Sequence, residues 1–373
     1  ILKSKLGHDA TEAFQEFHHR SSRAERMLKT LKSRKVEPNS DPLARDFALL
    51  RQELIDEGFY EPNYFHVAYR LLEVLFFAYI GYQLVWKGYF YTGLTILGLT
   101  AGRSGWVQHE ANHNSLTGNM NVDKLIGSFY FSMGEAGSAM WWVRSHNRHH
   151  ASPQHHQYDA DLSTLPLMAF EYLTALGGSR RWLKFQAYGF IPSTWLVVLF
   201  WKLYLHPRAI IKKRAISDGI FLIFHYGLYY HLFSYLGIGW MIWSHIVWGS
   251  IEGSYLFTNF ALSHTHKPVM EKSQSEDWIH SAINRTVNIK SSFLVNWWMG
   301  YLNCQIEHHL YPNMPQFRLP QIVPRVKALC KKHKLYYDEQ GYFETVGAMF
   351  ANLHTVGNAD TVGRGYAKTM RRN

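Results

Sequence analysis

The chain has 373 residues, a formal net charge of +11 and only two cysteines, Cys304 and Cys330. Two cysteines exclude a disulfide-rich secreted scaffold, and the basic residues are spread over several segments without a recognisable nucleic-acid module, so we expect membrane-orienting charge and no nucleic-acid partner. Aromatic residues make up 16% of the chain and charged residues only 18%, which indicates contact with a membrane interface.

The first 60 residues are polar, and the chain starts at Ile1 without a methionine or a signal peptide, so we expect a fragment or a trimmed chain. The basic stretch 29–35 and the PNSDP that follows it predict a linker, and the apolar periodicity of residues 43–57 predicts a surface helix.

Four segments are long and apolar enough to cross a bilayer, which takes about 20 residues in a helix. They are residues 65–86, 89–107, 218–236 and 238–262. Short glycine-containing turns join them in pairs. We therefore predict an all-α integral membrane protein whose four transmembrane helices form two hairpins and carry a cytosolic helical cap.

A fifth apolar stretch, residues 190–205, is short, contains Pro192 and is followed by the basic HPRAIIKKR. The positive-inside rule places this basic segment in the cytosol, so we expect the stretch to lie at the membrane interface and not to cross. Both ends of the chain and the loop from His109 to Asp218 then face the cytosol.

Three histidine clusters lie in these cytosolic segments. They are His109 and His113 in HEANH, His146, His149 and His150 in HNRHH, and His308 and His309 in QIEHH. Spacings of three and four residues place histidines on one face of a helix, and converging neutral imidazoles bind iron, zinc or copper. A single cluster could be an ordinary surface patch, but three on one membrane face predict a shared metal site.

The HEANH segment also fits the H-E-x-x-H pattern of zinc metalloproteases, with Glu110 as the hydrolytic base. An intramembrane zinc protease is therefore an alternative, but it leaves HNRHH and QIEHH without a role. A metal transporter is a further alternative, which would require ligands inside the predicted spans.

The three clusters together resemble the histidine boxes of membrane fatty acid desaturases. The closest resemblance is to the front-end, cytochrome b5-fusion desaturases of the delta-5/delta-6 type, in which a glutamine such as Gln305 opens the third box. WWVRSHNRHHASPQ, SHTHKPV and NWWMGYLNCQIEHHLYPNMPQFRLP extend the resemblance over nearly the whole chain.

This resemblance implies a site of two iron ions and no catalytic residues beyond the metal ligands. The implied ligands are His109, His113, His146, His149, His150, His308 and His309, with His264 after the fourth span as an eighth. Gln305 and His266 are possible metal or substrate contacts. Carboxylates that fix the imidazole tautomers are expected among Glu110, Asp159, Asp161 and Glu307, although ordinary capping or solvated acids explain each equally well.

The start of the chain, HDATEAFQEFHH, resembles the end of a cytochrome b5 domain, with His18 at the second haem-ligand position. The HPGG motif of the first haem ligand is absent, so haem is expected only if the missing part is present, and His18 and His19 are expected to be exposed. We divide the chain into a b5-like remnant (1–20), the linker and surface helix (21–60), the membrane domain with its cap (61–345) and a tail (346–373).

The implied activity is O2-dependent insertion of a cis double bond at the delta-5 or delta-6 position of a polyunsaturated acyl chain, carried as acyl-CoA or acyl-lipid. Electrons are expected from NAD(P)H through cytochrome b5 and its reductase, at the endoplasmic reticulum membrane with the site facing the cytosol. Desaturation of a sphingolipid long-chain base and lipid hydroxylation remain open alternatives on the same fold.

Overall fold

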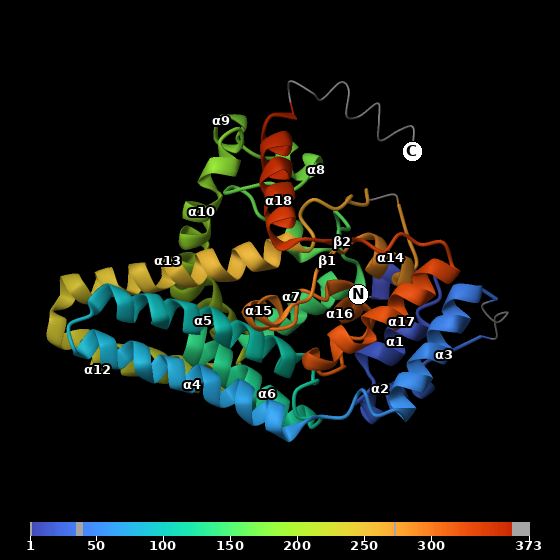
Figure 1. Ribbon diagram of the computed structural model, residues 1–373, viewed down its shortest axis with the longest axis horizontal. Helices are drawn as coiled ribbons and strands as arrows, with labels where there is room; N and C mark the ends of the chain where they lie inside the picture. The colour runs from blue at the N-terminus through green and yellow to red at the C-terminus, as the bar shows by residue number, and fades with distance from the viewer. Residues whose placement is uncertain (1, 35–39, 272–273, 360–373) are drawn as a thin grey trace.

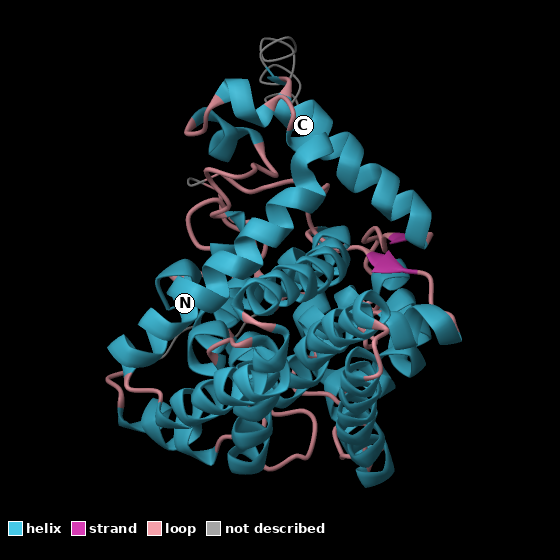
Figure 2. Cartoon of the chain, turned by 90° about the vertical axis from the view of Figure 1, so that its left-hand side faces the viewer, coloured by secondary structure: helices cyan, strands magenta, loops and turns pink. Residues whose placement is uncertain are grey.

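The computed structural model describes residues 2–34, 40–271 and 274–359, and almost all of its regular structure is helical. The helices are α1 (Thr11–Phe17), α2 (Ser22–Thr30), α3 (Pro42–Asp56), α4 (Tyr64–Trp86), α5 (Phe90–Asn112), α6 (Met120–Ser128), α7 (Ala139–Ala151), α8 (Tyr172–Leu176), α9 (Arg180–Leu183), α10 (Gln186–Phe200), α11 (His206–Lys213), α12 (Ile216–Phe233), α13 (Ile238–Leu262), α14 (Trp278–Asn284), α15 (Phe293–Trp298), α16 (Gln305–Leu310), α17 (Leu319–Lys332) and α18 (Tyr342–Gly357). Two short parallel strands, β1 (Asn288–Ile289) and β2 (Glu339–Gln340), lie at the edge of the helical body (Figure 2).

Four long helices, α4, α5, α12 and α13, lie side by side in one half of the molecule, and the shorter helices gather at one end of them (Figure 1). The turn between α4 and α5 contains Gly88 at φ +89°, and the turn before α13 contains Gly237 at φ +81°. These left-handed values suit glycine, which has no Cβ to clash there. The predicted all-helical fold and the two helical pairs are therefore present.

Helices α5 and α13 approach closely because α5 presents glycines to its neighbour. A Cβ added to Gly98 would lie 2.7 Å from Ile251 Cβ and 2.8 Å from the Trp248 carbonyl oxygen. Contacts this short force the two backbones apart, so small residues are needed along this seam.

We expect Gly98→Ala to lower the free energy of unfolding by about 1–3 kcal/mol, as for other overpacked sites. Gly227→Ala in α12 is the matched control, because a Cβ there meets nothing within 4 Å and alanine favours the helix. Thermal unfolding in detergent measures both variants; equal melting temperatures would contradict the tight seam.

Large apolar side chains point outward from α4, α10, α12 and α13, among them Leu72, Leu196, Ile223 and Ile242, which are 54–75% exposed. Such a continuous apolar exterior fits lipid and not water. By length and apolar composition, however, one helix of the described chain qualifies as able to cross a membrane, Gln186–Lys213. It contains the stretch predicted to lie at the membrane interface. The other long helices do not qualify because their tyrosines, tryptophans and charged residues lower their mean hydropathy.

The predicted surface helix is α3, which exposes its polar face and buries its apolar face. Leu43, Phe47 and Leu54 are at most 2% exposed and share a core with the third histidine box. Phe47 stacks on Tyr311 with ring centroids 5.2 Å apart. Of the predicted linker, residues 29–30 close α2 and Pro42 begins α3, while residues 35–39 lie outside the described residues.

The b5-like remnant also packs on the body of the protein. His18 is exposed, as predicted, with its ring beside Phe14, whereas His19 is half-buried against Tyr60, contrary to the prediction. Glu16 is fully buried and binds Arg51 at 2.6 Å.

The predicted tail 346–373 begins inside a packed helix. Met349 and Leu353 of α18 are fully buried in a cluster with Phe190 of α10. The folded body therefore extends past the predicted boundary at residue 345 to the end of α18, and residues 360–373 lie outside the described range.

Candidate metal centre

All eight histidines that the resemblance implies as ligands lie in two compact groups. His109, His113, His146, His150 and His308 form the first group, and His149, His264 and His309 form the second. Within each group the candidate ligand nitrogens lie within 4.8 Å of one another, and every member is buried. Since three or more imidazoles converge in each group, each could hold one metal ion.

The two groups are neighbours because adjacent residues divide between them. His149 belongs to one group and His150 to the other, and His308 and His309 divide in the same way. The rings of His150 and His309 stack at 4.1 Å. A short helical segment that presents consecutive histidines therefore serves both positions, which explains the doublets in the second and third boxes.

The histidines come from helix ends. His109 and His113 close α5, His146, His149 and His150 occupy the last two turns of α7, and His308 and His309 end α16. The carbonyl end of a helix carries partial negative charge, which stabilises a bound cation. The imidazoles themselves contribute no net negative charge.

Buried ring nitrogens without hydrogen-bond partners show that these residues fit a metal. Within the described chain, His109 Nε2, His113 Nε2, His308 Nε2, His150 Nδ1 and both nitrogens of His309 have none. Burying such groups unpaired is costly, and a metal ion would satisfy them. Burial lowers the pKa of His113 and of His264 to about 3, so both are neutral and able to coordinate.

Asp159 orients His149. Its Oδ2 lies 2.9 Å from His149 Nδ1, and Asp161 Oδ2 lies 3.4 Å from the same nitrogen. Burial lowers the pKa of His149, but these two carboxylates outweigh burial and raise that pKa to about 9. A proton held on Nδ1 by Asp159 leaves Nε2 as the ligand atom, the arrangement expected of carboxylate–histidine–metal units.

We expect Asp159→Asn to lower metal affinity or activity by about 10–100-fold, the usual cost of losing such a partner. Asp161→Asn should cost much less, because the Asp161 side chain is 56% exposed and lies farther from His149. Iron content and product formation, measured on both purified variants, test this order; equal losses would contradict the primary role of Asp159.

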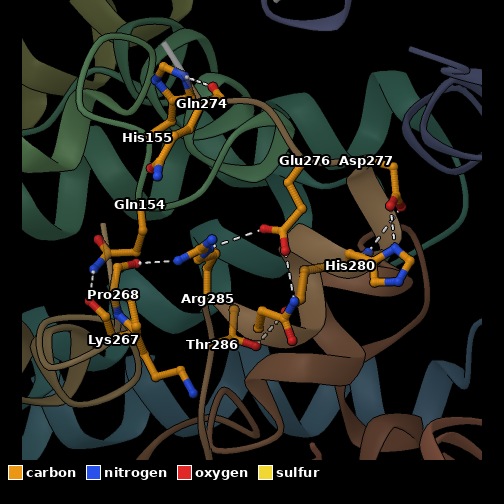
Figure 3. A network of polar contacts seen from close by, with 12 residues as sticks. Gln154, His155, Lys267, Pro268, Gln274, Glu276, Asp277, His280, Arg285 and Thr286 are labelled. Atoms are coloured by element: carbon orange, nitrogen blue, oxygen red, sulfur yellow. Dashed lines mark hydrogen bonds and ion pairs between the residues drawn. The ribbon is translucent and has the colours of Figure 1, made fainter. Parts of the chain in front are cut away.

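A network of polar contacts fixes the loop after α13, and Figure 3 shows the part formed by Gln154, Lys267, Pro268, Glu276 and Arg285. His264 Nδ1 donates to the Arg285 carbonyl oxygen at 3.1 Å, which leaves Nε2 facing the amide of Gln305 at 3.0 Å. Gln154 donates to the His264 and Lys267 carbonyl oxygens, and Arg285 binds the Pro268 carbonyl and Glu276. The second box and the fourth helix are thereby fixed to each other.

His266 belongs to neither group, and neither of its ring nitrogens has a hydrogen-bond partner in the described chain. Gln305 lies beside the second group, in contact with His264.

Two of the four predicted carboxylates do not contact a ligand. Glu110 accepts from the Gln316 backbone N–H at 2.9 Å and lies 3.5 Å from Arg70, because its helical position turns it toward α4. Glu307 accepts from Asn288 and Tyr337. Both are structural acids in this geometry, and only Asp159 and Asp161 contact a histidine of the two groups.

Sequence reasoning missed Gln316 and Trp142. The Gln316 side chain lies 2.7 Å from His109 Nδ1, and the Trp142 ring stacks on His146 at 4.1 Å. Gln316 could have been found from the PQFRLP segment, which is part of the resemblance. Trp142 could have been found from its position one turn before His146 on the same helix.

A shared histidine centre at the ends of outwardly apolar helices fits a membrane metalloenzyme. Comparison with known proteins identifies the family. Residues 64–341 match the model of the fatty acid desaturase family. An acyl-lipid (8-3)-desaturase of Rebecca salina is 45% identical over 96% of this chain and 87% of its own length, and one of Thraustochytrium sp is 37% identical with the same coverage. A delta(8)-fatty-acid desaturase of Euglena gracilis is 27% identical over 90% of this chain and 85% of its own.

The chain belongs to the fatty acid desaturase family, and its relatives are front-end desaturases. It is therefore an oxidoreductase of lipid metabolism.

Proposed function

We propose that the protein is a front-end acyl-lipid desaturase that inserts a cis double bond at the delta-5 or delta-6 position of a polyunsaturated acyl chain. The observation that carries this proposal is the pair of adjacent histidine groups, which suits two metal ions at one centre. We further propose iron as the metal and all eight grouped histidines as its ligands.

Two iron ions with O2 would supply the oxidising power that removing hydrogen from unactivated methylenes requires, which no amino-acid side chain can provide. The residues of this chain would bind the metal ions, orient the imidazoles and shield the centre from water. Asp159 and Gln316 hold two imidazoles in place. Trp142 packs on His109 and His146, and Phe260 packs on His109 and is itself backed by Trp106. This apolar wall excludes water from the reacting position.

For the membrane arrangement we propose that α4, α5, α12 and α13 cross the bilayer and that α10 lies at the cytosolic interface. Two observations support it. The four helices run alongside one another while α10 runs across them (Figure 1), and the grouped histidines occupy one end of the four-helix body. The basic segment HPRAIIKKR then faces the cytosol, consistent with the endoplasmic reticulum membrane and a cytosol-facing site.

For the electron supply we propose cytochrome b5 and its reductase, with NAD(P)H as the source. Support comes from the resemblance of the first 20 residues to the end of a cytochrome b5 domain and from the packing of α1 near the site. Phe17 lies 6.3 Å from the ring of His150 and 6.1 Å from that of Trp278. His18 would be a haem ligand only in a complete domain.

The test is expression in yeast with defined acyl chains, followed by mass spectrometry that locates the new double bond. Because two relatives carry 8-3 in their names and an acyl-lipid (9-3)-desaturase of Physcomitrium patens is 28% identical, chains already unsaturated at carbon 8 and at carbon 9 are both supplied. A product two hydrogens lighter, with the bond on the carboxyl side of the existing one, supports the proposal. A gain of oxygen indicates a hydroxylase, and a changed long-chain base indicates the sphingolipid alternative.

The zinc protease alternative is disfavoured by Glu110. That carboxylate lies beside Arg70 and His66 and not with the histidine groups, so it is not placed to activate a metal-bound water.

A further inference from the structure

A second set of ionisable side chains lies buried between the long helices, and the proposed function gives it no role. Glu135 follows the π-helical turn Phe129–Met133, Lys202 lies in the π-helical turn Trp201–Leu205, and Glu252 lies in α13. They are 5%, 2% and 2% exposed. Burying charged groups is costly, so each needs an explanation.

Lys202 and Glu252 account for each other. Their Nζ and Oε2 atoms lie 2.6 Å apart, and the ammonium also lies 5.4 Å from the centre of the Trp248 ring. Glu135 is different, because its Oε1 has no hydrogen-bond partner within the described ranges. A buried carboxyl group without a partner favours its neutral, protonated form.

Glu135 lies between this ion pair and the metal ligands. A Cβ placed on Gly105 would lie 2.8 Å from Glu135 Oε1 and 2.9 Å from Leu256 Cδ1, so the carboxyl group is level with these two residues. Gly105 precedes His109 by one helical turn, about 6 Å along α5. Along α13, Glu252 precedes Leu256 by one turn and is therefore one turn farther from the histidines, which lie near the end of this helix.

The reaction needs protons at a buried place. Conversion of –CH2–CH2– to –CH=CH– with O2 also takes up two electrons and two protons and releases two waters. The electrons come from the haem-protein donor of the proposed function. Metal-bound imidazoles are neutral ligands and have no proton to spare at the coordinating nitrogen, so another group must carry the protons inward.

We propose that Glu135 delivers protons to the metal centre, which rests on the proposed function. Its O–H bond breaks as the proton passes to the oxygen being reduced, and the resulting carboxylate takes up the next proton from the side of the Lys202–Glu252 pair. His206, one turn after Lys202, continues this line toward α11, and both of its buried ring nitrogens lack partners in the described structure. Two other imidazoles face Lys202. His225 binds the Met133 carbonyl oxygen through Nδ1, and His245 has no hydrogen-bond partner at either ring nitrogen within the described residues.

The first test uses metal-free protein and infrared spectroscopy. Wild-type protein at neutral pH should show the C=O stretch of a protonated carboxyl group that shifts in D2O, and Glu135→Gln should remove it. Glu53→Gln is the control, because Glu53 is exposed on α3 and should leave the band unchanged. A band that persists in Glu135→Gln, or no such band in the wild type, overturns the proposal even if desaturation itself proves correct.

The second test compares iron-loaded variants of equal iron content. Glu135→Gln should slow desaturation by about 10²-fold, increase the solvent deuterium isotope effect and raise the electrons consumed per double bond. Glu135→Asp should recover part of the rate and lower the number of electrons consumed per double bond. This variant replaces Glu135→Gln in the comparison with wild type if the glutamine variant fails to fold. A wild-type rate and isotope effect in Glu135→Gln refutes the role, and so does a Glu135→Asp variant that is no faster than Glu135→Gln. An inactive wild type with the infrared band intact would count against the proposed function alone.

Discussion

His149→Ala should leave less than about one hundredth of the wild-type desaturation, since losing only a partner of a ligand already costs about 10–100-fold. His149 lies in the second histidine group, and it also faces the two carboxylates Asp159 and Asp161. Its removal leaves two imidazoles in that group and the buried Asp159 without its histidine partner, which is costly. Product formation in yeast and iron content of the purified protein measure the loss.

His156→Ala is the matched control for this variant. His156 lies in the same segment, is 35% exposed and binds Glu171 outside both groups, so its loss should leave desaturation near the wild-type level. Both variants should reach the membrane in similar amounts. Retained desaturation in His149→Ala at normal protein levels would refute the shared metal site.

His264→Ala should reduce bound iron from two ions to about one per chain and abolish product, while His266→Ala should keep both. The two residues stand in one short loop, but only His264 reaches the second group, where it contacts Gln305. A three-imidazole group that loses one ligand holds its metal weakly. The reverse order of effects would show that His266 is the ligand in the metal-loaded protein.

Sequence patterns predicted the helices and the convergence of the histidines because both depend on local spacing. Intervals of three and four residues put His146, His149 and His150 on one face, and long apolar segments predicted α4, α5, α12 and α13. The division of the eight residues into two groups was not predictable, since it depends on how α5, α7 and α16 approach one another.

The contacts around the histidines were predicted less well for the same reason. Asp159 follows His149 by ten residues in one loop, so a local contact was a reasonable prediction, and the structure has it. Gln316 is 207 residues from His109, and only the packing of the chain brings them together. Glu110 adjoins His109 in the sequence, yet the helix turns it toward Arg70 instead.

The burial of α3 against the third histidine box has a practical consequence for exchanging electron donors. Phe47 stacks on Tyr311, two residues after His309. Helix α3 therefore supports the segment that carries His308 and His309, and it is not a linker between domains. Chimeras that swap the haem module should therefore keep residues 42–56 with the histidine-bearing part. A junction placed at the start of α4 would remove α3 and its packing against the third histidine box. The metal centre would then be destabilised although all of its histidines are still present.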